Sequence, residues 1–146
     1  MKKLLLPLAV LLVMVACNSK KSDDKEKQAK DIQKEVLEMH DIAMPKSMKI
    51  PDLEKEVNRL LDSVNKLTGK ASEEAAPLKA KLESLKGDLS YAYMAMDKWM
   101  TEFRLDSFKN NVEERIKYFM DEKLKAGKMK DAVLNSIAKA DSLLKK

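Results

Sequence analysis

Apolar residues recur along most of the chain at alternating spacings of four and three, the period of a helix in a coiled-coil-like bundle. The first run covers residues 32–67, and its phase is kept across Pro45 and Pro51. These two prolines predict a break between Met44 and Asp52, because proline in a helix interior costs about 3 kcal/mol. The run is therefore expected to form one kinked helix or two stacked helices with the same apolar face.

Two further runs come after it. The second covers residues 78–103 without a gap in its period, and Gly69 is placed to end the helix before it. The third covers residues 108–144 and loses its period around Gly127. It predicts either one helix weakened at the glycine or two helices joined there by a hairpin.

The lengths of these runs predict the architecture. The helical spans are expected at residues 28–67, 72–103 and 106–145, and the links between them are short, so neighbouring helices must be antiparallel. No segment alternates as a strand would. The predicted fold is all-α, an elongated antiparallel three-helix bundle, with four helices if the last span breaks at Gly127.

The N-terminus has a different pattern, "MKKLLLPLAVLLVMVAC". Two lysines precede an apolar stretch that is too short for a bilayer-spanning helix, which needs about 20 residues, and typical of a secretory signal. "MVAC" resembles the lipobox of bacterial lipoproteins, in which the cysteine is acylated and the peptide is cut before it. Cys17 is the only cysteine of the chain, so no internal disulfide can use it. The sequence predicts a signal peptide at 1–16 and lipidation of Cys17.

The segment after the cysteine, "NSKKSDDKEKQAK", is polar and has no apolar period. Residues 17–27 are therefore expected to be the acylated cysteine and a disordered tether, and residues 28–146 the bundle domain. Asn18, next to the cysteine, resembles the sorting signal for the outer membrane of Gram-negative bacteria. "SDDKE" resembles the serine–acidic signal that sends Bacteroidota-type lipoproteins to the cell surface. The periplasmic and surface faces both stay open.

Composition narrows the function classes. Of the 146 residues 36% are charged and 5% aromatic, and the formal net charge is +5. Because acids and bases are interleaved, they indicate solvated helix faces, and no basic stripe for nucleic acid is present. The chain has 3 isolated glycines, so a phosphate-binding loop is not expected, and no Ser–His–Asp or Cys–His pattern is found. A non-enzymatic protein is expected.

The candidate chemistry lies in "HDIAMPKSMKI" and "YAYMAMDKWM". Folding the first two spans about a turn near Lys70 sets residue 70 − n level with residue 70 + n. His40 then faces Met100, and Met44 faces Met96. Several apolar side chains of these stretches lie off the core seam. One region of the bundle is thus expected to be apolar over more of its circumference than the core requires.

Three interpretations of this cluster are open. In the first, the methionines serve only as flexible core-filling residues. In the second, they form a surface for a protein partner or for self-association, with Met48, Met94 and Trp99 as candidate contacts. The third interpretation is a soft-metal site, in which His40, Met44, Met96 and Met100 bind copper as Cu(I).

The two stretches also resemble a family of small helical Bacteroidota-type lipoproteins, some of whose members are labelled "viral A-type inclusion protein". Members read close to H-D-x-x-M-P-K-M and A-M-x-x-W-M. Here "HDIAMPKSM" fits the first motif with Ser47 as an extra residue, and "AMDKWM" fits the second. The resemblance implies a lipid-anchored helical protein of the envelope and no enzymatic activity.

Overall fold

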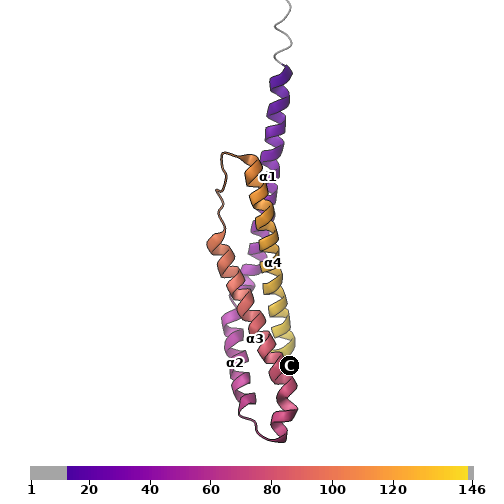
Figure 1. Cartoon of the computed structure of the whole chain (residues 1–146), viewed down its shortest axis with the longest axis vertical. Helices are drawn as coiled ribbons and strands as arrows, with labels where there is room; N and C mark the ends of the chain where they lie inside the picture. Colours follow the sequence, from indigo (N-terminus) through magenta and orange to yellow (C-terminus); the bar gives the residue numbers. More distant parts are fainter. Residues whose placement is uncertain (1–12, 145–146) are drawn as a thin grey trace, which may run out of the picture.

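The computed structural model describes the backbone of residues 13–144 and the side chains from Ser22 to Leu144. Four helices make up this part of the chain: α1 (Val13–Ser47), α2 (Ile50–Asn65), α3 (Lys70–Glu102) and α4 (Val112–Leu144). No strand occurs among the described residues. The predicted all-helical bundle is confirmed, and it is elongated (Figure 1). None of the described helices is long and apolar enough to cross a membrane.

The predicted break in the first span is confirmed, and its position has a clear cause. Pro51 cannot donate a backbone hydrogen bond, and its ring would clash with the carbonyl of Ser47, four residues earlier. α1 accordingly ends at Ser47, and Pro51 lies in the first turn of α2, where proline is tolerated. Pro45 remains inside α1. The fourth helix therefore comes from the break at Pro51.

The alternative break at Gly127 is wrong, because α4 is continuous through that residue. The helix is held on both sides of the glycine, since Ala126 and Met129 are buried in the core. A helix interior tolerates glycine at a cost of about 1 kcal/mol. The flanking core contacts outweigh that cost.

The helices are offset from one another along the long axis of the molecule. α1 lies beside α4 at one end of the molecule, and α2 lies beside α3 at the other (Figure 1). α1 and α4 run parallel, as the ion pairs Lys25–Glu113 and Glu35–Lys123 show, whereas the Asp88–Lys139 pair joins the antiparallel α3 and α4. Only the middle of the bundle has three helices in its cross-section. This explains why Leu78, a predicted seam residue, is exposed, since α4 does not reach it.

The link between α3 and α4 differs from the prediction. The sequence predicts a two-residue turn at 104–105, but the chain is non-helical from Phe103 to Asn111. Glu102 and Lys125 lie at the same level, so α4 starts about 13 residues, or roughly 20 Å, beyond the end of α3. The linking segment spans this distance (Figure 1). It is fixed by a hydrogen bond of 2.8 Å from the Arg104 backbone N–H to the Tyr118 hydroxyl.

The predicted tether also differs from the structure, which continues α1 through residues 17–27. Two ion pairs hold this part of α1 against the start of α4, Lys25 with Glu113 and Glu26 with Arg115. Ala29 is buried there as well. The charges that are typical of a solvated tether are therefore partly used in contacts with α4.

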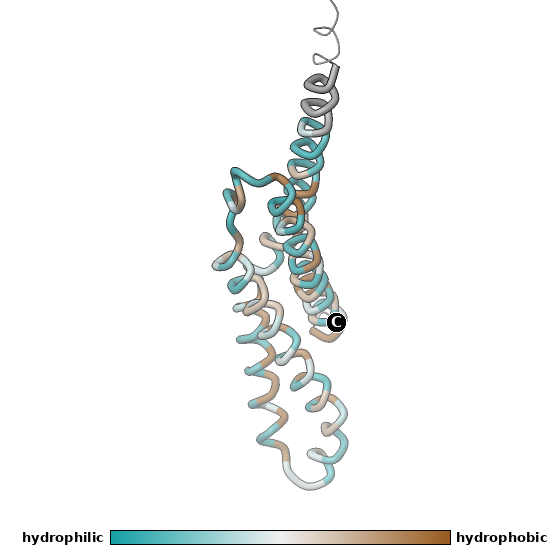
Figure 2. The backbone as a smooth tube through the Cα atoms, turned by 45° about the horizontal axis from the view of Figure 1, so that its top comes forward, coloured by the Kyte–Doolittle hydropathy of each residue, from teal (hydrophilic) through white to brown (hydrophobic). Residues whose placement is uncertain are grey.

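Most of the core lies on the predicted seams, but Leu61, Ala126 and Met129 join it from other positions. Apolar residues recur among polar ones along the helices (Figure 2). Gly69 has φ 60°, a left-handed conformation that favours glycine, and it separates α2 from α3 as predicted. The buried cluster comprises Val36, Ala43, Ile50, Val57, Leu61, Leu82, Leu85, Leu89, Ala92, Met96, Trp99, Ala126, Met129, Val133, Ile137 and Ala140.

Candidate functional site

The break between α1 and α2 lies beside the C-terminal half of α3, as the turn arithmetic predicted. His40 of α1 contacts Trp99 of α3, with ring centroids 5.4 Å apart. On its other side Trp99 stacks on Phe103 at 4.6 Å and 18°. Trp99 is buried, and its indole N–H has no hydrogen-bond partner among the described residues. These rings fix the level of α1 against α3.

A methionine hollow lies next to this ring stack. Its volume is about 270 Å³, and it opens between the end of α1, the start of α2 and α3. Ser47 is one of the residues that line it, and its hydroxyl donates a 2.8 Å hydrogen bond to the carbonyl of Met44. The lining residues are Met44, Ser47, Met48, Pro51, Tyr93, Met96, Asp97 and Met100. Four thioethers thus surround one small space.

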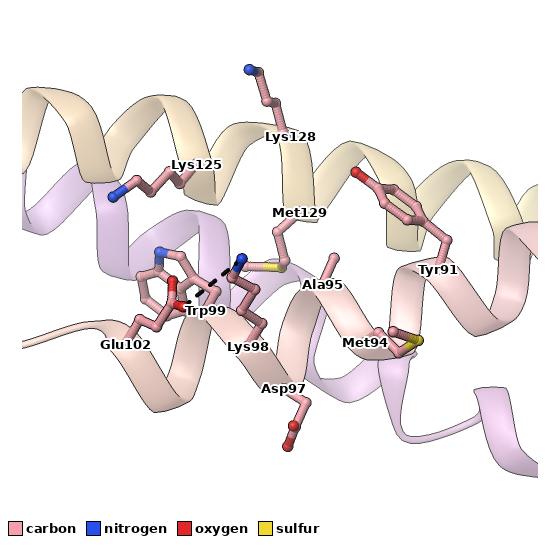
Figure 3. Close-up of a pocket in the computed structure, with 10 residues that line it drawn as sticks. All are labelled: Tyr91, Met94, Ala95, Asp97, Lys98, Trp99, Glu102, Lys125, Lys128 and Met129. Atoms are coloured by element: carbon pink, nitrogen blue, oxygen red, sulfur yellow. Dashed lines mark ion pairs between the residues drawn. The ribbon is translucent and has the colours of Figure 1, made fainter.

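A second and larger hollow, of about 580 Å³, lies between α3 and α4 (Figure 3). Its floor is apolar, from Ala95, Trp99 and Met129, with Tyr91 and Met94 exposed at one end. Figure 3 shows the side chain of Asp97 directed away from α4, and the side chain of Tyr91 reaching toward it. The remaining lining residues are Lys98, Glu102, Lys125 and Lys128.

The lysines on the rim of this α3–α4 hollow differ in their partners. Lys125 contacts Asp121 at 2.7 Å and the buried Glu122 at 2.9 Å. The hydrogen bond to Asp121 contributes most to raising the pKa of Lys125, and the one to Glu122 contributes next. Lys98 lies 3.9 Å from Glu102. Lys128 forms no salt bridge within residues 22–144. It is therefore the rim cation available to a ligand.

The structure brings together most of the predicted site residues. Met44, Met96 and Met100 share the methionine hollow, and Met48, expected on a partner surface, joins them there. His40 does not line that hollow. Its Nδ1 is 3.0 Å from Asp41 Oδ1, and its ring faces Trp99.

The other predicted partner contacts, Met94 and Trp99, line the α3–α4 hollow. Sequence reasoning missed Lys125, Lys128 and Met129, because it did not give the register of α4 against α3. It could have found Tyr93 and Asp97, which lie within one helical turn of Met96 on α3.

The predicted signal peptide falls largely on residues 1–12, outside the described part of the chain, and the side chain of Cys17 also lies outside it.

The predicted metal site lacks a cluster of the usual charged or imidazole ligands in the described part of the chain. Among the described residues no group of three or more His, Cys, Asp or Glu side chains could hold a metal ion.

Comparisons with protein-family models, curated proteins and solved structures find no match to this chain. A function must therefore be inferred from the fold class and from the geometry of the two hollows.

Proposed function

We propose that this protein is a non-enzymatic, lipid-anchored helical bundle of the outer membrane that binds a partner protein in the α3–α4 hollow. The observation that carries the proposal is the apolar floor of that hollow, with Tyr91 and Met94 exposed beside it. Exposed apolar surface next to a groove is typical of interaction sites. Tyrosine, tryptophan and methionine are also the residues enriched in interfaces.

The shape and charge of the hollow favour one kind of partner. A groove between two helices accepts the apolar face of a third helix, whose side chains at spacings of three and four enter it. Lys128 lies on the rim without a salt bridge among the described residues, and Lys125 lies near it. The best fit is an amphipathic helix of an envelope protein with an acidic residue beside its apolar face.

The anchor is supported by the sequence and by the shape of α1. The lone Cys17 follows "MVA", and cleavage and lipidation there would place residue 17 of α1 at the membrane surface. Lys25, which forms an ion pair with α4, lies eight positions after Cys17, about 12 Å along the helix. Figure 1 shows this end of α1 extending beyond the other helices. The anchored protein would therefore present the hollow at a distance from the membrane.

Photo-crosslinking in intact envelopes tests the partner. A crosslinking amino acid replaces Tyr91 at the hollow or, as control, Met120, an exposed residue of α4 that lines neither hollow. We expect one dominant adduct from position 91, absent from position 120 and lost when Met94→Glu is added. Adducts of equal yield from both positions would refute the proposal. A dominant adduct of this chain with itself would show that the hollow binds a second copy of the chain and would refute the proposal of an envelope partner.

A further inference from the structure

The methionine hollow brings four thioether side chains together. Four of the chain's ten methionines line it, as two pairs spaced four residues apart, Met44 with Met48 and Met96 with Met100. On a helix this spacing puts both members of a pair on one face, as holds for Met96 and Met100 on α3. Met48 lies just beyond the end of α1, and its backbone N–H donates a 3.3 Å hydrogen bond to the carbonyl of Met44.

Burial divides the four methionines into two kinds. Met96 is only 2% exposed and Met44 is half-buried against the core, so both fill space in the usual way. Met48 is 70% exposed and Met100 is 41% exposed. Burial of apolar surface gives these two little stabilisation. Both lie on the rim of the hollow that Met44 and Met96 also line.

Thioether sulfur is a soft, neutral ligand that favours Cu(I) over the hard divalent cations. A site made of neutral ligands suits a monovalent ion, and Asp97 adds one carboxylate to the lining. Asp97 makes no salt bridge within residues 22–144, so its charge is available to balance that of the ion. The hydroxyls of Ser47 and Tyr93 are harder donors and are expected to contribute less.

We propose that Met44, Met48, Met96 and Met100 form a Cu(I)-binding site at the junction of α1, α2 and α3. His40 is not a ligand in this site, because its ring packs against Trp99 and does not line the hollow. The α3–α4 hollow proposed for the partner shares Asp97 with this site but none of its four methionines. Either proposal can fail without the other.

The test is an anaerobic titration of the full-length protein in detergent with Cu(I), in competition with a chromophoric Cu(I) chelator. We expect one Cu(I) per chain. Met48→Leu and Met100→Leu are each expected to weaken binding at least about tenfold, and unchanged circular dichroism would show that the fold is kept. The matched controls Met94→Leu and Met120→Leu change methionines that are 65% and 54% exposed and lie outside the hollow, and they should leave affinity unchanged.

A second measurement locates the ion. With methionine methyl groups labelled for NMR, Ag(I) as a redox-inert probe should shift four methyl signals, assigned by the single Leu variants. His40→Ala should leave the Cu(I) affinity unchanged. Absence of Cu(I) uptake at micromolar concentrations would overturn the proposal. It would also be overturned by equal losses in the control variants, or by a larger loss in His40→Ala than in Met48→Leu.

Discussion

Glu122 is a buried carboxylate whose position depends on one lysine. It is 3% exposed, and Oε1 accepts a hydrogen bond of 2.9 Å from Lys125 Nζ, while Oε2 has no partner among the described residues. Lys125 itself is half-exposed. The lysine thus donates a hydrogen bond to a charge that lies between the core residues Phe119 and Ala126. Lys125→Ala is therefore expected to destabilise the bundle.

The magnitude depends on the unequal burial of the two groups. Removing one partner of a fully buried ion pair costs about 3–5 kcal/mol, whereas exposed pairs contribute about 0–1 kcal/mol. Because Lys125 is half-exposed, the expected loss lies between these limits, at about 1–3 kcal/mol. For a domain of this size the melting temperature should fall by roughly 3–10 °C. Lys128→Ala, the control, should change stability by less than about 0.5 kcal/mol.

A double-mutant cycle isolates the interaction. Glu122→Met replaces the carboxylate with an apolar side chain of similar length, a change that is often neutral or stabilising for a buried charge. In the Glu122→Met background Lys125→Ala should cost little, so the coupling free energy should exceed about 0.5 kcal/mol, the usual error of additivity. Urea unfolding followed by circular dichroism measures all four proteins. Equal losses for Lys125→Ala and Lys128→Ala, or additive effects in the cycle, would refute the reasoning.

Four other outcomes are expected. Cys17→Ala should abolish palmitate labelling and membrane retention, and a wild-type protein that takes up no label would exclude the lipid anchor. Leu85→Asp should unfold the bundle, because it buries an unpaired charge in the core, and retention of the native helical signal would contradict the assigned packing. Gly127→Ala should stabilise α4 by about 0.5–1 kcal/mol, since the added Cβ meets only Met39 Sδ at 3.9 Å. A lower melting temperature would indicate that the helix is not continuous at this residue. The hydrogen bond from Lys25 lowers the pKa of Glu113, so the pair stabilises α1 above the ordinary carboxyl pKa, and this stabilisation is lost as pH falls through the lowered pKa. Amide hydrogen exchange near Lys25 should therefore become faster in acid. Glu113→Gln should remove this pH dependence.

The sequence by itself determined the helices and most of their boundaries. The spacing of apolar residues marked the buried faces, since a helix of a bundle must turn the same side to the core along its length. Pro51 marked the break between α1 and α2, and Gly69 marked the turn between α2 and α3, because both residues act on the local backbone. The turn after α2 is short, so the pairing of Met44 with Met96 could also be obtained by counting residues.

Only the tertiary structure decided the register of α4. That helix is linked to α3 by nine non-helical residues, and such a segment permits many offsets along the bundle axis. Packing of Phe103 against Tyr118 and Phe119, together with the ion pairs between α1 and α4, selects one offset. The α3–α4 hollow, the burial of Glu122 in the core and the ion pairs that hold residues 25–26 of α1 against α4 all depend on that choice. These features rest on contacts between residues distant in sequence, and periodicity within a single helix carries no information about them.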